Sequence, residues 1–150
     1  AIWLFATHPE QWQLLRREPA RIKAAFNEAL RLETPIHCFT RVAKADTVVG
    51  GVDVPAGARV MVSFASANRD ERKWHDPERF DITRESAAQL AFGHGEHACI
   101  GMGLARLEGA ALLSALLERA GSIELDGPPV RKLNNLIRSF ASLPVKVGPG

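Results

Sequence analysis

Apolar residues recur near the start of the chain at a spacing that predicts helices. Residues 1–6 are almost entirely apolar and predict the end of a helix. A second helix is predicted over 8–17, because Thr7 is a candidate cap and Pro9 fits a first helical turn. Glu10 stands three residues after Thr7, as in a capping box. Two short helices are therefore expected in succession.

Two longer helices are predicted further along. The first covers 20–32, where apolar residues share one stripe, and it ends before Pro35. The second covers 102–120, where leucines and alanines recur at helical spacing. Gly121 stands where a glycine cap would end this helix.

The middle of the chain changes to β-branched residues and turn signals. Residues 36–64 are predicted to be β-rich, with a hairpin at Gly50-Gly51. Residues 68–101 mix charges, single aromatic residues and glycines with little periodicity. A stretch this long without regular structure is typical of a functional or packed segment. The whole pattern predicts a mainly α protein with small β-sheets.

Composition limits the class of protein. The chain has 150 residues, 46% hydrophobic and 24% charged, with a net charge of +2 and two cysteines. These values exclude a disordered tail, a collagen-like repeat and a disulfide scaffold. No apolar run reaches the ~20 residues of a membrane-spanning helix, and no signal peptide is visible. The apolar start without a methionine predicts that residues 1–6 are the truncated end of a longer helix.

The most informative segment is the glycine-rich loop over 92–101, which contains Cys99. Its glycines indicate either backbone conformations that other residues cannot adopt or a backbone that lies close to a flat ligand. Cys99 lies just before the longest helix, whose N-terminal amides favour a thiolate. Two other interpretations of Cys99 stay open: it is a buried apolar cysteine, or it forms a zinc site with His94 and His97. A phosphate-binding loop is excluded, because the third glycine and the Lys-Ser/Thr pair are missing.

The spacing Phe92-x-x-Gly95-x-x-x-Cys99-x-Gly101 resembles the haem-binding loop of the cytochromes P450. The resemblance implies that Cys99 is the thiolate ligand of the iron of haem b, and that His97 hydrogen-bonds a haem propionate. It also implies that Gly95 lets the backbone pass close to the porphyrin. The cofactor-binding residues implied in this way are Cys99, as metal ligand, with His97, Arg41, Phe92, Gly93, Gly95, Gly101 and Ala105.

A second motif supports the resemblance. Glu28 and Arg31 are three residues apart on a predicted helix, where such side chains meet. Taken alone they fit a solvated surface pair. P450s, however, carry Glu-x-x-Arg at this place, completed by an arginine in a Pro-Glu-Arg-Phe segment, and residues 77–80 have that sequence. The resemblance implies a buried structural network of Glu28, Arg31 and Arg79 beneath the haem.

The resemblance also implies a substrate pocket and a partner surface. The substrate-pocket candidates are Ile36, His37, Cys38, Phe39, Leu136 and Ile137. Cys38 is expected to be a free thiol, because a disulfide with Cys99 would remove the iron ligand. The candidate contacts of a ferredoxin-type electron donor are Arg72, Lys73 and Arg106, for which scattered solvated charges are an equal alternative.

The acid–threonine pair that activates oxygen in this family has no counterpart in the chain. Asp46-Thr47 looks similar, but it follows Lys44 rather than glycine and lies in a strand-like segment. The family's pair precedes the Glu-x-x-Arg motif, on a helix of which residues 1–6 are the end. No catalytic residue of this kind is therefore expected within the chain.

Residues 1–150 are accordingly identified as the C-terminal part of a single P450 domain. The implied function is that of a haem-thiolate monooxygenase, which inserts one oxygen atom from O₂ into a small organic substrate with electrons from a redox partner. Residues 140–146 resemble members that oxidise small aromatic acids. The alternative is a haem-binding or partner-binding module without oxygenase activity of its own. The likeness to bacterial members implies a cytoplasmic protein, with the missing N-terminal part as a further partner and no nucleic acid.

Overall fold

The computed structural model describes residues 1–150 and consists of helices with short strands. The helices are α1 (Ile2–Thr7), α2 (Pro9–Arg17), α3 (Ile22–Glu33), α4 (Phe64–Ala67) and α5 (Met102–Arg119), with 3₁₀ turns η1 (Pro19–Arg21) and η2 (Gly95–His97). The strands are β1 (Cys38–Val42), β2 (Thr47–Val49), β3 (Val52–Val54), β4 (Arg59–Ser63), β5 (Ala120–Leu125), β6 (Val130–Lys132), β7 (Ser139–Ser142) and β8 (Val145–Pro149).

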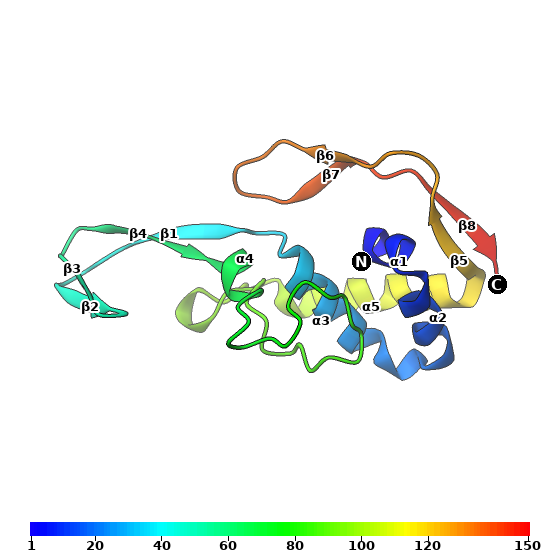
Figure 1. The fold of residues 1–150 in the computed structure, drawn as a ribbon, viewed down its shortest axis with the longest axis horizontal. Coiled ribbons are helices and arrows are strands. Elements are labelled where there is room, and N and C mark those ends of the chain that lie inside the picture. The colour runs from blue at the N-terminus through cyan, green and yellow to red at the C-terminus, as the bar shows by residue number, and fades with distance from the viewer.

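The strands form four separate two-stranded antiparallel sheets, which pair β1 with β4, β2 with β3, β5 with β8 and β6 with β7. The first two pairs make an arm at one end of the molecule, whereas α1, α2 and the β5–β8 pair lie toward the other (Figure 1). Gly50 and Gly51 have φ values of 60° and 82°, so the β2–β3 hairpin turns where the glycine pair predicts it.

The hydrophobic core lies where α1, α2, α3 and α5 meet β5. Phe5 is fully buried there, with ring centroids 5.2 Å from Trp12 and 5.5 Å from Phe80. Phe80 and Ile82 come from the irregular stretch after α4, which is therefore packed against the helices although it has no regular structure. Residues far apart in the chain thus share one core.

Two expected helix caps are wrong. Thr7 belongs to α1, where its hydroxyl donates to the carbonyl of Trp3, and α2 begins after His8 without a side-chain cap. The chain leaves α5 through extended residues directly into β5, so Gly121 is a strand residue and not a cap. A Cβ at Gly121 would overlap the carbonyl oxygen of Pro149 on β8, which shows that strand pairing requires this glycine.

The fold class expected from the sequence, helices with small antiparallel sheets, is confirmed. None of the helices combines the length and the apolar character needed to cross a bilayer.

Candidate functional site

The loop that carries Cys99 is closed by its own backbone hydrogen bonds. The N–H of Gly93 donates to the carbonyl of Leu90 at 2.9 Å, and the N–H of Cys99 donates to the carbonyl of Phe92 at 2.8 Å. Gly93 and Gly95 have φ values of 71° and 67°, which other residues rarely adopt. A Cβ at Gly93 would also lie 3.2 Å from the carbonyl oxygen of His97. The glycines therefore let the loop fold tightly behind Cys99.

Cys99 is a free, exposed thiol at the edge of an apolar cavity of about 430 Å³. This cavity, called the Cys99 cavity below, is lined by Leu30, Pro35, Ile36, Phe39, Phe64, Ala91, Phe92, Gly93, His97, Cys99 and Ile100. Its walls come from the end of α3, the segment leading into β1, the start of α4 and the glycine-rich loop. The exposure of the thiol contradicts the reading of Cys99 as a buried apolar cysteine.

The Cys99 cavity brings together predicted residues of both groups: the cofactor candidates Phe92, Gly93, His97 and Cys99, and the pocket candidates Ile36 and Phe39. Gly95, Gly101 and Ala105 stand outside the lining, in the loop and on α5. Arg41 is also outside it. Its guanidinium donates to the carbonyl of Thr40 and lies 5.8 Å from the ring centroid of Phe39.

Five lining residues escaped prediction from the sequence: Leu30, Pro35, Phe64, Ala91 and Ile100. Ile100 is fully exposed. Because it directly follows Cys99, its position in the sequence alone could have predicted that it lines the cavity. Phe64 joins the wall because β4 pairs with β1 and places its ring 6.0 Å from that of Phe39. That contact depends on strand pairing, which no local pattern reveals.

The other pocket candidates lie beside the cavity. Ile36 forms an isolated antiparallel bridge with Ile137, and the N–H of His37 donates to the carbonyl of Leu136 at 3.2 Å. Cys38 is a free thiol at the start of β1. Leu136 and Ile137 are 40% and 43% exposed and do not line the cavity, although the turn that carries them is tied to its wall.

A buried ion-pair network joins α3 to the irregular stretch, but its third member is not the arginine expected. Glu28 and Arg31 are both fully buried, and the Arg31 guanidinium donates to both carboxylate oxygens of Glu28 at 2.8 and 2.9 Å. The side chain that completes the network is Arg84, whose Nε lies 3.1 Å from Glu28 Oε1.

Arg79 has an exposed side chain and contributes only its carbonyl oxygen, 3.2 Å from Arg31 Nη2. The expectation that the Arg79 guanidinium completes the network is therefore wrong. The backbone around Asp81 turns so that its own N–H, rather than the Arg79 side chain, reaches Glu28 at 3.2 Å.

Two of the three expected partner contacts, Lys73 and Arg106, line a second hollow of about 590 Å³ beside the glycine-rich loop. This Lys73 hollow is lined by Lys73, Ala87, Ala88, Gln89, Leu90, Phe92, Gly93, His94, Gly95, Ala98, Met102 and Arg106. Arg72 lies outside it and pairs with Asp70, at 2.6 Å between Nη2 and Oδ2. The hydrogen bonds from Arg72 lower the pKa of Asp70 to about 2, so this arginine faces an ionised carboxylate.

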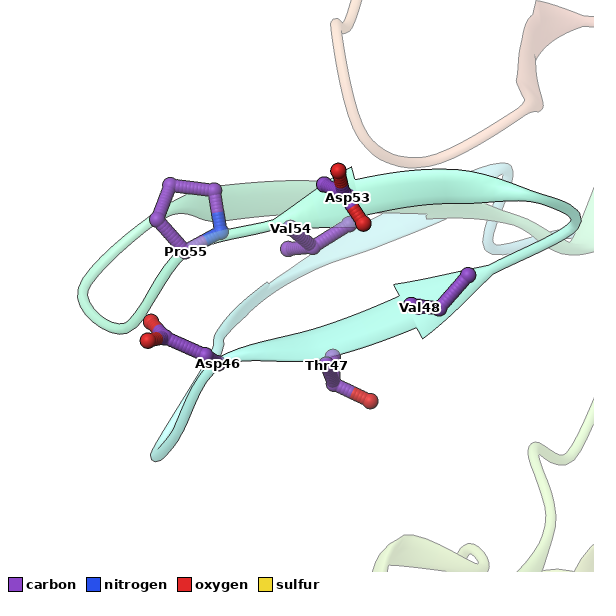
Figure 2. A pocket seen from close by; sticks show the side chains of 6 residues that line it. All are labelled: Asp46, Thr47, Val48, Asp53, Val54 and Pro55. Atoms are coloured by element: carbon purple, nitrogen blue, oxygen red, sulfur yellow. The ribbon is translucent and has the colours of Figure 1, made fainter.

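Asp46 and Thr47 belong to the β2–β3 hairpin and not to the Cys99 cavity. Figure 2 shows their side chains pointing away from each other beside an open hollow of the hairpin. Asp46 Oδ1 accepts the N–H of Ala56 at 2.8 Å, a bond that joins the start of β2 to the turn after β3. His94, His97 and Cys99 form no metal-ligand group, so the structure offers the zinc reading no ligand set.

An exposed thiol on a glycine-bent loop at a helix start, facing apolar walls, has the features of a haem-thiolate site. The chain matches the family described as Cytochrome P450 over residues 21–142, which is most of its length, and it therefore belongs to the cytochrome P450 family. Membership implies a haem cofactor.

Curated relatives agree with this assignment. The chain is 40% identical over 149 residues to cytochrome P450 CYP199A2 of Rhodopseudomonas palustris, covering 99% of the chain and 36% of that protein. It is 40% identical to cytochrome P450-terp of a Pseudomonas species, covering 97% of the chain and 34% of that protein. The chain thus spans about a third of the length of these relatives.

Solved structures show the same fold. Cytochrome P450-153 from Novosphingobium aromaticivorans superposes with a TM-score of 0.93 at 33% identity, covering 98% of this chain and 38% of that one. CYP109Q5 from Chondromyces apiculatus superposes with a TM-score of 0.91 at 37% identity, covering 99% and 39%.

Proposed function

We propose that the chain supplies the thiolate side of the haem site of a cytochrome P450 monooxygenase, with Cys99 as the ligand of the iron of haem b. The observation that carries the proposal is the exposed Cys99 thiol at the edge of an apolar cavity built from four segments. The core that joins α1 to β5 supports the further proposal that residues 1–150 belong to one domain.

The residues present fit a haem. Its flat, largely apolar macrocycle needs apolar walls, and residues such as Ile36, Phe39, Phe64 and Ile100 supply them. His97 lines the same cavity, and its ring can donate a hydrogen bond to a carboxylate at the rim. When bound, haem supplies the oxygen chemistry, which an axial thiolate assists by donating electron density.

The other residues hold and shield the thiolate. The helix α5 begins at Met102, three residues after Cys99, so the positive end of its dipole lies close to the thiol along the chain. Phe92 and the glycines close the loop behind it, and we assign Gly95, Gly101 and Ala105 to this backbone support. Arg41 stands beside Phe39 and is proposed to bind a propionate, which requires its side chain to rotate toward the cavity.

The spectrum of the ferrous carbonyl complex tests the proposal. The chain is loaded with haem, reduced and exposed to carbon monoxide, and a red-shifted, thiolate-type Soret band is expected. Cys99→Ser is expected to lose this band, whereas Cys38→Ser, which removes the other free thiol, keeps it. A band that survives in Cys99→Ser would refute the proposal, whereas a folded chain that takes up no haem would show that these residues cannot assemble the site alone.

Relatives named 6-deoxyerythronolide B hydroxylase and vitamin D(3) 25-hydroxylase support hydroxylation of an organic substrate as the reaction. Product analysis with a redox partner decides between this and the alternative of a haem-binding module without oxygenase activity. The alternative is kept because the chain spans about a third of its relatives. Haem uptake without product under conditions of efficient reduction would favour the module.

The electron donor is proposed to be an acidic, ferredoxin-type protein that docks at the Lys73 hollow. Lys73 and Arg106 both line it. Arg106 also lies 5.6 Å from the ring centroid of Phe92 in the glycine-rich loop over 92–101, called the cysteine loop below. The double variant Lys73→Glu, Arg106→Glu is expected to slow haem reduction by a [2Fe–2S] ferredoxin at low salt. Lys146→Glu on β8 is the matched control, and equal slowing in both would refute this docking site.

A further inference from the structure

Asn68 makes two long-range side-chain hydrogen bonds from a buried position just after α4. It is 1% exposed. Its Nδ2 donates to the hydroxyl of Thr34 at 3.0 Å, and its Oδ1 accepts the N–H of Leu90 at 2.7 Å. A side-chain amide carries a donor and an acceptor on separate atoms, so one residue can bind both partners at once.

The Thr34 bond fixes the point where the chain leaves α3 toward the cavity wall. Thr34 is fully buried and has a φ of 36°, a left-handed conformation that is costly for a β-branched residue. Its hydroxyl donates to the carbonyl of Arg31 at 2.7 Å and accepts from Asn68. The next two residues, Pro35 and Ile36, line the Cys99 cavity, so the direction set at Thr34 places that wall.

The Leu90 bond fixes the point where the chain enters the cysteine loop. Leu90 donates its N–H to Asn68, and its carbonyl accepts the N–H of Gly93 at 2.9 Å. The turn so formed leads to Phe92, whose carbonyl accepts the N–H of Cys99 at 2.8 Å. A short series of hydrogen bonds therefore connects the Asn68 side chain to the backbone of Cys99.

The backbone of Asn68 is held as firmly as its side chain. Its carbonyl accepts from Arg31 Nη1 at 2.7 Å, and its N–H donates to the carbonyl of Phe64 at 2.9 Å. Phe64 is itself a wall of the Cys99 cavity, and Arg31 belongs to the buried pair with Glu28. Asn68 is thus bonded to three of the segments around the cavity while it lines none of it.

We propose that Asn68 is a positioning residue, which holds the cysteine loop at a fixed distance from the opposite wall of the Cys99 cavity. The inference rests on the proposed function of Cys99 as the iron ligand. Nothing in the local sequence around Asn68 marks this role, because both side-chain partners are distant: Thr34 by 34 residues and Leu90 by 22.

The first test uses the chain without haem and measures amide hydrogen exchange by NMR. Asn68→Ala removes the acceptor of the Leu90 N–H, and the exchange rate of this amide is expected to rise roughly tenfold, as loss of one hydrogen bond allows. Asn68→Asp keeps the acceptor and should keep Leu90 protected. Leu113→Ala, a core change on α5, controls for general destabilisation and should not raise Leu90 exchange selectively.

The second test uses the haem-loaded chain and the carbon monoxide spectrum. Asn68→Ala and Asn68→Asp are both expected to convert part of the thiolate-type band into the shorter-wavelength band of a displaced or protonated ligand. Thr34→Val removes the acceptor of the Asn68 Nδ2 and should do the same, which keeps the test valid if Asn68→Ala does not fold. Leu113→Ala should retain the thiolate-type band.

The outcomes separate the two proposals. No thiolate-type band in the unchanged chain overturns the proposed role of Cys99, and the positioning role falls with it. A normal band in the unchanged chain, together with normal bands in Asn68→Asp and Thr34→Val and an unchanged exchange rate at Leu90 in Asn68→Ala, overturns the positioning role alone.

Discussion

At the scale of single residues, the most demanding position is Glu28, a carboxylate with no exposed surface. Burying an ionised carboxylate costs several kcal/mol unless hydrogen bonds replace its water. Here two bonds from Arg31, one from Arg84 and the N–H of Asp81 do so. The network therefore fixes α3 against the irregular stretch after α4. It contributes mainly to the specificity of that arrangement.

Glu28→Ala is expected to lower the free energy of unfolding by about 3–5 kcal/mol, because it leaves the buried Arg31 without its counter-charge. The variant should also take up no haem, since the network holds the stretch that leads to the cysteine loop. Urea unfolding and haem titration measure the two effects. Glu18→Ala breaks an exposed pair with Arg21 and should cost at most about 1 kcal/mol. Full haem occupancy and unchanged stability in Glu28→Ala would contradict the role given to the network.

The two arginines of the irregular stretch are expected to behave differently. Arg84→Ala should lower the free energy of unfolding by about 1.5–3 kcal/mol, since it removes a charged hydrogen bond to buried Glu28. Arg79→Ala should change it by less than about 0.5 kcal/mol, because its side chain is exposed and its carbonyl remains. The same urea titrations decide, and equal losses would mean that the Arg79 side chain also stabilises the network.

Residues whose role depends on local chemistry could be predicted from the sequence. Residues whose role depends on the direction of a side chain in the folded protein could not. Cys99 and its glycines were recognisable because loop conformation and helix start are local features. The choice between Arg79 and Arg84 depends on how the backbone turns near Asp81, which a motif does not encode. The sequence predicts no role for the Asn68 side chain, since both of its partners lie far along the chain.

At the scale of elements, α5 packs directly against α3 at Gly109. A Cβ there would overlap the ring of Phe26 on α3, whereas a Cβ at Gly103, in the first turn of α5, meets nothing within 4 Å. Gly109 is buried although α5 has a largely exposed surface. The glycine therefore sets how close the two helices lie.

Gly109→Ala is expected to lower the free energy of unfolding by about 1–3 kcal/mol, the usual effect of overpacking. Gly103→Ala is the matched control on the same helix. It should raise stability by up to about 1 kcal/mol, because alanine favours the helix and no neighbour is displaced. Thermal and urea unfolding measure both variants. Stabilisation by Gly109→Ala would show that the Phe26 ring moves aside freely.

Element boundaries were predictable where the deciding interaction is local. The Gly50-Gly51 hairpin required only the positive φ of two adjacent glycines. The expectation that Gly121 caps a helix is wrong because the pairing of β5 with β8, which requires a glycine there, joins residues twenty or more positions apart. Tertiary pairing overrides a local cap signal in such cases.

At the scale of the whole molecule, the Cys99 cavity joins α3, the entry to β1, the start of α4 and the cysteine loop. A ligand that contacts all four segments binds only the folded chain and therefore stabilises it. At a free haem concentration 100 times its Kd, the free energy of unfolding should rise by about 2.7 kcal/mol. For a chain of this size, this corresponds to an increase in Tm of roughly 5–10 °C.

Differential scanning calorimetry with and without haem measures that increase, and the cysteine variants show its origin. Cys38→Ser should keep the full increase in Tm, because Cys38 does not line the cavity. Cys99→Ser should lose most of it, since apolar contact with the macrocycle remains but the bond to the iron does not. An equal increase in both variants would mean that haem binds the chain through apolar surface alone.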